Sequence, residues 1–134
     1  MNVMKTQIIL ILFSILFSFS LKAQTNNPID GEWYTVENRS IVRFQTDTIS
    51  GLTVGRVIWI SPNVPPERAD VMRGKEMARN LTYSSKKQKY FGELYIPKTD
   101  DFKNAEIIVE KEKLSITVRM GFTTRTVEWK KKTE

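Results

Sequence analysis

The chain has 134 residues, of which 21 are Lys or Arg and 15 are Asp or Glu, giving a formal net charge of +6. This length suits one domain, and a hydrophobic fraction of 40% is enough for a packed core and argues against disorder. Cysteine and histidine are both absent. Their absence excludes disulfides, thiolate nucleophiles, histidine-assisted triads, and zinc, copper or haem sites built on those side chains.

The first 23 residues are organised like a cleavable secretory signal. A short positive segment ending at Lys5 precedes an apolar run over 8–21, and Ala23 supplies a small residue before a polar segment. The apolar run is shorter than the ~20 residues that cross a bilayer. We therefore expect cleavage near Ala23 and an exported protein, periplasmic or extracellular, with residues 24–134 as its one domain and no stable membrane anchor after cleavage.

The basic excess does not indicate a nucleic-acid partner. Cleavage removes two basic residues and no acidic ones, so the remainder has a net charge of +4. The basic residues are interleaved with acids, and the clusters at 86–89 and 130–132 fit a solvated turn and a chain end better than a nucleic-acid groove.

Beyond the signal, apolar residues recur with period two, which is typical of strands. The predicted strands, in chain order, are 31–37, 40–45, 52–60, 81–83, 90–96, 105–109, 114–120 and 123–129. The segment 61–80 is the exception, because Pro62, Pro65 and Pro66 break any ladder. Within it, 67–73 predicts one or two helical turns with Pro66 at the first position and Gly74 at the end. Seven or eight short strands at regular spacing favour an antiparallel barrel or sandwich.

Several short motifs, spread from about Ile29 to Lys131, resemble a known family. They are Gly31-x-Trp33, Val54-Gly55-Arg56-Val57-Ile58-Trp59-Ile60, Met72-Arg73-Gly74-Lys75-Glu76-Met77, Gly92-x-Leu94-Tyr95-x-Pro97, Leu114-x-Ile116 and Thr126-Val127-Glu128-Trp129-Lys130. In this order the chain resembles the exported bacterial family called domain of unknown function 2147 (DUF2147). The resemblance implies a compact lipocalin-like β-barrel with no established activity. We therefore predict an all-β fold: one small antiparallel lipocalin-like barrel of about eight strands with a Pro-rich, short-helical excursion.

The chain departs from the family at two places. Ile96 stands where the family has Asp, and an Asp-x-x-Asn-Pro-containing loop is reduced to 62–66. Any function that those polar positions carry in relatives is not expected here.

Gly31 and Trp33 are interpreted first as structural residues. In the lipocalin pattern that they resemble, the tryptophan plugs the closed end of the barrel and stacks on a basic residue of the last strand. Arg125 shares a face with Val127 and Trp129, so we expect Arg125 to point inward and fill that role.

Two charges fall on apolar faces of predicted strands. Arg56 aligns with Val54 and Ile58, and Glu93 aligns with Phe91 and Tyr95. A buried charge needs a partner, so we expect rim residues or an internal ion pair; the alternative is an anion-binding arginine inside a pocket.

Catalysis is not expected. Asp100, Asp101 and Asn104 form the nearest cluster of oxygen ligands, but their position after Pro97 favours a solvated turn over a cation site. Carboxylates for glycoside chemistry would have to come from Glu93, Glu106, Glu110 or Glu128, and the last three are expected to face water. We therefore predict no enzyme activity, no metal and no cofactor.

Two functions from different classes remain. The first is non-catalytic binding of a small apolar or anionic ligand in a barrel pocket lined by Arg56, Trp59, Tyr90 and Tyr95. The second is a structural or interaction protein of the cell envelope, with a filled barrel and an exposed apolar patch near 62–80. The sequence predicts neither the ligand, nor the envelope partner, nor the oligomeric state.

Overall fold

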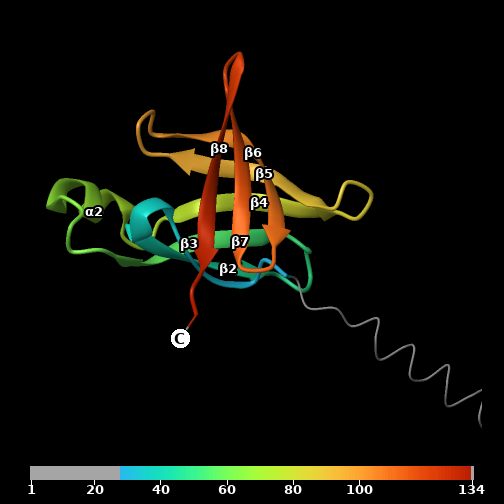
Figure 1. Ribbon diagram of the computed structural model, residues 1–134, viewed down its shortest axis with the longest axis horizontal. Coiled ribbons are helices and arrows are strands. Elements are labelled where there is room, and N and C mark those ends of the chain that lie inside the picture. Colours follow the sequence, from blue (N-terminus) through green and yellow to red (C-terminus); the bar gives the residue numbers. More distant parts are fainter. Residues whose placement is uncertain (1–27, 134) are drawn as a thin grey trace, which may run out of the picture.

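The computed structural model describes residues 28–133, which form a closed antiparallel barrel of eight strands (Figure 1). The predicted signal, residues 1–23, lies outside the described residues. The prediction of an all-β small barrel is confirmed. None of the described helices has the length and apolar character needed to cross a membrane.

The strands follow one another around the barrel in chain order, and β8 closes the barrel against β1. A short 3-10 helix, η1 (Val36–Asn38), joins β1 to β2, and the helix α2 (Pro66–Met72) lies between β3 and β4. The strands are β1 (Gly31–Tyr34), β2 (Ser40–Thr46), β3 (Thr53–Ile60), β4 (Glu76–Ser84), β5 (Lys89–Ile96), β6 (Asp101–Glu110), β7 (Lys113–Met120) and β8 (Thr123–Lys131).

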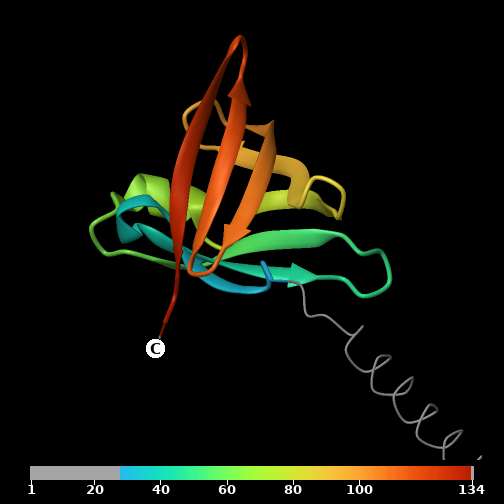
Figure 2. The ribbon, with the colours of Figure 1, turned by 45° about the vertical axis from the view of Figure 1, so that its right-hand side comes forward.

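Because neighbouring strands are antiparallel, alternate connections meet at the same end of the barrel. The β1–β2, β3–β4, β5–β6 and β7–β8 connections lie at one end, which we call the mouth (Figure 2). The remaining three connections lie at the opposite end. The mouth is therefore bordered by η1, α2 and the β5–β6 turn, while the tip of the β7–β8 hairpin projects beyond it.

Alternate side chains of the later strands fill the interior, as their period-two pattern predicts. The inward residues of β6, β7 and β8 include Ala105, Ile107, Leu114, Ile116, Val118 and Trp129, all buried. Trp33, Phe44 and Tyr90 are the largest wholly buried side chains. The centre of the barrel is thus packed with side chains.

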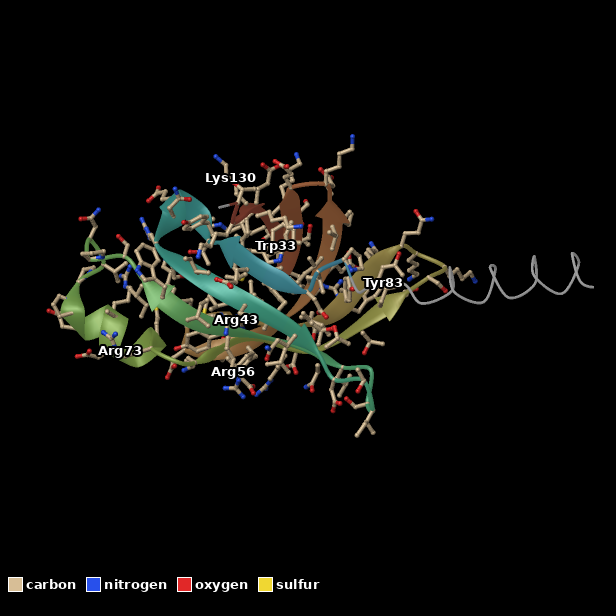
Figure 3. All side chains as sticks on the ribbon, turned by 90° about the horizontal axis from the view of Figure 1, so that it is seen from below. Trp33, Arg43, Arg56, Arg73, Tyr83 and Lys130 are labelled. Carbon is tan, nitrogen blue, oxygen red and sulfur yellow. The ribbon has the colours of Figure 1, made fainter. Side chains whose placement is uncertain are left out.

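The inward face of β3 is the reverse of the one that its apolar residues suggest. Thr53, Gly55 and Val57 point inward, whereas Arg56 points out (Figure 3). The reason lies at Gly55, where an added Cβ would come within 2.8 Å of the Phe44 ring. The β2 side chains occupy the interior beside β3, so β3 places its small residues there.

The excursion after β3 is shorter than predicted. Its helix has Pro66 at the first position, as the sequence predicts, and Gly74 follows with a φ of +70°. However, β4 already begins at Glu76, so its first residues were wrongly included in the excursion 61–80. Met77 and Ala78 are buried against the core, and their burial keeps this segment in the sheet.

Trp33 is wholly buried, but its basic neighbour differs from the expected one. Its indole Nε1 donates a hydrogen bond to the Ile29 carbonyl at 2.9 Å. The β8 residue opposite Trp33 is Lys131, whose Nζ lies 6.0 Å from the ring centroid. Arg125 is exposed and pairs with Val118 instead. It lies six residues earlier in β8, about 20 Å along an extended strand, so it is not the partner of Trp33.

Replacing Trp33 by Ala should lower the free energy of unfolding by about 3–5 kcal/mol, because it deletes a buried aromatic ring and orphans the Ile29 carbonyl. Urea unfolding of residues 24–134 measures this loss. Arg125→Ala is the control and should change stability by less than about 0.5 kcal/mol, because its side chain is exposed. Equal losses in the two variants would contradict this assignment.

Replacing Gly92 by Ala should cost about 1–3 kcal/mol through overpacking. An added Cβ would lie 2.8 Å from the Arg79 carbonyl oxygen and 2.9 Å from the Leu81 Cα, and backbone cannot move aside cheaply. At Gly55 the obstruction is the Phe44 and Val42 side chains, which have more freedom to shift. Thermal unfolding should therefore give a lower melting temperature for Gly92→Ala than for Gly55→Ala. The reverse order would contradict the explanation that a backbone obstruction costs more than a side-chain one.

Candidate functional site

The mouth of the barrel contains two adjoining cavities of about 500 and 480 Å³. The same side chains line parts of both: Arg39, Arg68, Met77, Pro97 and Trp129. We call the combined space the mouth cleft. Its walls come from the β1–β2 connection, the α2 excursion, the β5–β6 turn and the upper part of the β7–β8 hairpin.

The floor of the mouth cleft is apolar. Met77 is 6% exposed and Trp129 is 4% exposed, and both belong to the barrel core. Leu94 and Val118 continue this floor on the β5 and β7 side, and Met72 of α2 closes it from the excursion. A hydrocarbon group placed here would lie directly on the top layer of the core.

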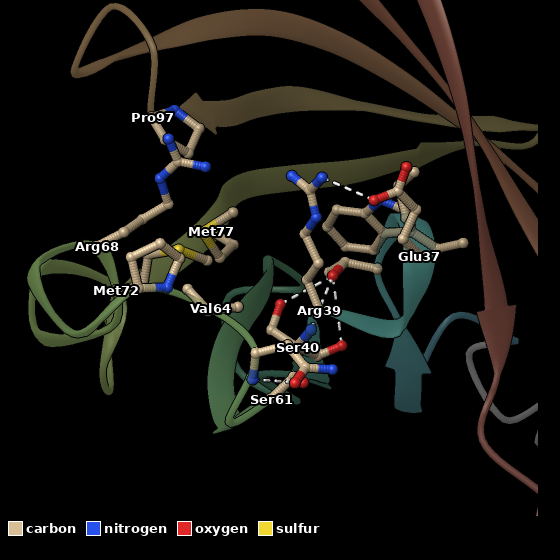
Figure 4. Close-up of a pocket in the computed structure, with 14 residues that line it drawn as sticks. Glu37, Arg39, Ser40, Ser61, Val64, Arg68, Met72, Met77 and Pro97 are labelled. Atoms are coloured by element: carbon tan, nitrogen blue, oxygen red, sulfur yellow. Dashed lines mark hydrogen bonds and ion pairs between the residues drawn. The ribbon is translucent and has the colours of Figure 1, made fainter.

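The rim of the mouth cleft is cationic. Arg39, Arg68, Lys98 and Arg125 line it, and among the described residues Glu37 is its one acidic lining residue. Figure 4 shows the Arg39 and Arg68 guanidinium groups on opposite sides of the cleft. Arg39 is paired with Glu37 at 2.7 Å. Across residues 28–133, no carboxylate lies within ion-pair distance of Arg68, Lys98 or Arg125, so the rim has an uncompensated positive charge.

Local hydrogen bonds hold the Arg39 side of the mouth cleft in place. The Thr35 and Ser40 hydroxyl oxygens are 2.9 Å apart, and the Ser40 amide donates to the Thr35 hydroxyl. The Ser61 amide donates to the Arg39 carbonyl at 2.8 Å, which ties the β1–β2 connection to the end of β3. The Arg39 backbone is therefore fixed before any ligand arrives, while its exposed side chain can adjust.

Arg56, the predicted anion ligand, is not in the mouth cleft. Its side chain is 57% exposed on the outer face of β3 and forms an ion pair with Glu76 at 2.8 Å. The outer groove that it lines also contains Asp30, Glu32 and Asp47. Since these carboxylates offset the arginine charge, this groove does not favour an anion.

The three predicted aromatic ligands are not brought together. Trp59 is 42% exposed at the end of β3, and Tyr90 is buried in the interior near Ile29. Only Tyr95 lines the mouth cleft, where its hydroxyl donates to Asp100 and the Lys75 Nζ lies 3.8 Å from its ring centroid. The structure therefore disperses the set predicted from the sequence over the outer face, the core and the mouth.

The carboxylates considered for catalysis or metal binding are engaged elsewhere. Glu93 points outward, and hydrogen bonds from Asn80 and Arg79 lower its pKa. Hydrogen bonds from Thr99 and Lys103 likewise lower the pKa of Asp101. Among the described residues there is no cluster of three or more His, Cys, Asp or Glu side chains suited to a metal ion. A carboxylate with a lowered pKa is a poor proton donor at neutral pH.

Sequence reasoning missed Arg39, Arg68 and Met77, and it assigned Arg125 to the wrong role. A usable signal was present in the predicted topology. In an up-and-down barrel the first, third, fifth and seventh connections share one end, and Arg39, Arg68 and Lys98 all lie in such connections. Met77 fell within the same predicted excursion as Arg68, but its burial as a β4 residue had no signal, because the excursion was expected to lie outside the sheet.

Comparisons with known proteins add no functional information. No family model matches the chain, and no curated protein or solved structure matches it either. The mouth cleft is therefore interpreted from its own geometry, and membership of the DUF2147 family stays a prediction.

Replacing Tyr90 by Phe should leave stability unchanged or raise it by up to about 2 kcal/mol, because the buried Tyr90 hydroxyl has no hydrogen-bond partner among the described residues. Burial raises the pKa of this phenol above its ordinary value of 10, and the charges of the nearby Asp30 and Tyr83 add to the rise. The unfolded chain therefore loses this proton first, so the associated stability is present below pH 10 and lost as the pH rises above it.

Urea unfolding between pH 7 and the alkaline range tests this expectation. Tyr90→Phe should show a shallower alkaline loss of stability than the native protein, while Tyr83→Phe, which removes only the smallest cause of the raised Tyr90 pKa, should stay much closer to the native slope. A loss of more than about 1 kcal/mol in Tyr90→Phe at neutral pH would instead mean that the hydroxyl is hydrogen-bonded in solution.

Proposed function

We propose that this protein is an exported, non-catalytic binding protein that takes a small amphipathic anion at the mouth of its barrel. The observation that carries the proposal is the pairing of an apolar floor with three rim cations, Arg68, Lys98 and Arg125, that lack carboxylate partners among the described residues. Small-molecule sites typically combine mostly apolar walls with a few polar groups that fix orientation. The mouth cleft has this composition.

The charge of the rim selects the ligand class. Arg68 and Arg125 approach the cleft from α2 and β8, and a guanidinium group binds a carboxylate or sulfonate through paired hydrogen bonds. The apolar part of the ligand would lie over Met77 and Trp129. Each of the two cavities that make up the cleft, of about 500 and 480 Å³, is within the range of small-molecule pockets, so the ligand is of the size of a medium-chain or aromatic acid.

The absence of catalysis and the exported location remain part of the proposal. Glu93 and Asp101 have lowered pKa values. A carboxylate with a lowered pKa is a poor general acid at neutral pH. Export rests on the sequence of the segment preceding residue 24. An exported binding protein of this kind needs only a preformed pocket and a stable scaffold.

The alternative, an interaction protein of the cell envelope with a filled barrel, also has an observation in its favour. The barrel interior is packed, and the excursion leaves Val71 of α2 58% exposed, with Trp59 of β3 42% exposed. The two readings predict different behaviour of the mouth arginines, because an interaction surface at the excursion does not depend on Arg125.

The fluorescent anion 1-anilinonaphthalene-8-sulfonate should bind residues 24–134, and decanoate should displace it while the uncharged decanol competes poorly. Arg68→Gln and Arg125→Gln should each weaken binding about tenfold or more, because each removes a charge-assisted hydrogen bond. Fluorescence titration measures both affinities, and urea unfolding should show unchanged stability for these exposed residues.

Arg56→Gln is the matched control, because it removes an ion-paired arginine outside the mouth. It should bind the probe with native affinity. Loss of binding in Arg56→Gln but not in the mouth variants would move the site back to β3. Equal displacement by decanoate and decanol would contradict the role given to the cationic rim, and lack of any saturable binding would favour the interaction protein.

A further inference from the structure

The β7–β8 hairpin stands free of the rest of the barrel at its outer end. The pairing of β7 with β6 stops at Val118, and the pairing of β8 with β1 involves only Lys130 and Lys131. From Arg119 to Thr124 the two strands pair only with each other. Figures 1 and 2 show the resulting ribbon projecting well beyond the other connections.

The most exposed large apolar side chain of the described residues is at the tip of this hairpin. Phe122 follows Gly121 in the turn and is 109% exposed, so no part of its ring packs on the protein. Gly121 has a φ of +69°, which the tight turn requires and which glycine adopts readily. The turn thus presents a phenylalanine ring to solvent at the point farthest from the core.

Cations stand on both faces of the ribbon below this ring. Cross-strand pairing places Arg119 beside Thr124 on one face and Arg125 beside Val118 on the other. Neither arginine has a carboxylate within ion-pair distance among residues 28–133, and the chain carries no acidic residue between Glu112 and Glu128. Glu93 and Glu106 share an outer groove with Arg119, but they are paired with Arg79 and Lys89.

We propose that the tip of the β7–β8 hairpin docks on the surface of a lipid bilayer that contains anionic lipids. The Phe122 ring enters the boundary between headgroups and acyl chains, and the flanking arginines bind the lipid phosphates. An aromatic or aliphatic side chain flanked by basic residues is the composition of segments that lie at a membrane interface. Basic side chains near such a surface gain from its negative potential.

The size of the tip favours a bilayer over a protein partner. A specific protein interface buries about 800 Å² on each side, whereas a single phenylalanine offers about 150–250 Å². The ribbon below the ring carries Thr123, Thr124 and Arg119, which are hydrophilic and exposed. A bilayer needs no complementary shape, so one inserted ring and two cations suffice for weak, reversible attachment.

The protein contains a matched comparison at the other end of the barrel. Ile49, in the β2–β3 turn, is 95% exposed, but the charge beside it is the Asp47 carboxylate, which accepts a hydrogen bond from the Ile49 amide. Hydrogen bonds from the Ile49 amide and the Ser50 hydroxyl lower the Asp47 pKa, so the carboxylate is ionised at neutral pH. An anionic bilayer should therefore repel the Ile49 tip and attract the Phe122 tip.

Vesicle sedimentation of residues 24–134 tests this proposal. Every strand and the whole described core lie within this fragment, and it omits the apolar run 8–21, which would bind lipid by itself. We expect binding to vesicles of phosphatidylcholine and phosphatidylglycerol in equal parts. We expect little binding to pure phosphatidylcholine, and weaker binding to the mixed vesicles at high salt.

Phe122→Ser should weaken binding to the mixed vesicles at least about tenfold, since it removes the inserted ring, and Arg119→Gln should weaken it about fivefold. Ile49→Ser removes an equally exposed apolar side chain and should bind like the native protein. Phe122→Trp should retain binding, and its added fluorescence should shift to the blue with mixed vesicles only. All four changes lie on exposed residues, so urea unfolding should match the native protein.

Native binding by Phe122→Ser, or equal losses in Phe122→Ser and Ile49→Ser, would overturn the proposal. The proposal would also fail if the native protein did not bind the mixed vesicles and light scattering showed a dimer that Phe122→Ser abolishes. In that case the tip would contact a second copy of the chain. None of these changes touches Arg68, so retention of 1-anilinonaphthalene-8-sulfonate by the same variants tests the mouth cleft separately.

Discussion

The mismatch in length between the first and last strands controls the shape of this barrel. β1 has four residues and β8 has nine, and only Trp33 and Tyr34 pair with Lys131 and Lys130. Closure therefore happens at one end of β8, and the rest of that strand has no partner on the β1 side. The open mouth and the free hairpin both follow from this mismatch, because β1 gives way to η1 before it can accompany β8 outward.

The space left by the short β1 is covered by connecting segments that do not pair with any strand. The β1–β2 connection brings Arg39 to the cleft that Trp129 also lines, and the excursion brings Arg68 and Met72 from the opposite side. These segments cover core residues without filling the space above them. The mouth cleft is thus the direct consequence of ending a barrel with loops instead of strands, and its cations lie there because connections are solvated and tolerate charge.

The overall fold was predictable because the strongest patterns lie in the strands that form the most regular part of the barrel. Leu114, Ile116 and Val118 alternate without interruption, and each is buried as predicted. In β3 the alternation of apolar residues predicted the wrong inward face. The Phe44 and Val42 side chains occupy the interior beside Gly55, where there is no room for a larger residue. The apolar residues Val54 and Ile58 lie on the same outer face of β3 as Arg56. Their alternation was interpreted as core-facing, so Arg56 was wrongly predicted to line a pocket inside the barrel.

The candidate site was less predictable because it depends on which connections meet, whereas periodicity reports only which way a strand faces. Tyr95 was found because it is a strand residue near the mouth, while Arg39 and Arg68 lie in connections that have no period to read. The topology was sufficient to group them, but not to show that Arg68 would lack a carboxylate partner within residues 28–133. That feature depends on side-chain positions in α2 and the β5–β6 turn.

The two proposals concern neighbouring parts of one end of the molecule, and Arg125 links them. It lines the mouth cleft and also stands on the inner face of the free ribbon, opposite Val118. If the ribbon tip rests on a bilayer, the β8 wall of the mouth cleft belongs to the same ribbon that contacts the bilayer, and an amphipathic ligand enters that bilayer through its apolar tail. A ligand with an apolar tail would then move from the bilayer to Met77 and Trp129 without full exposure of its tail to water. Water would otherwise oppose this transfer by about 0.8 kcal/mol per CH₂ group, so the position of the hairpin gives the mouth cleft a physical route to its ligand.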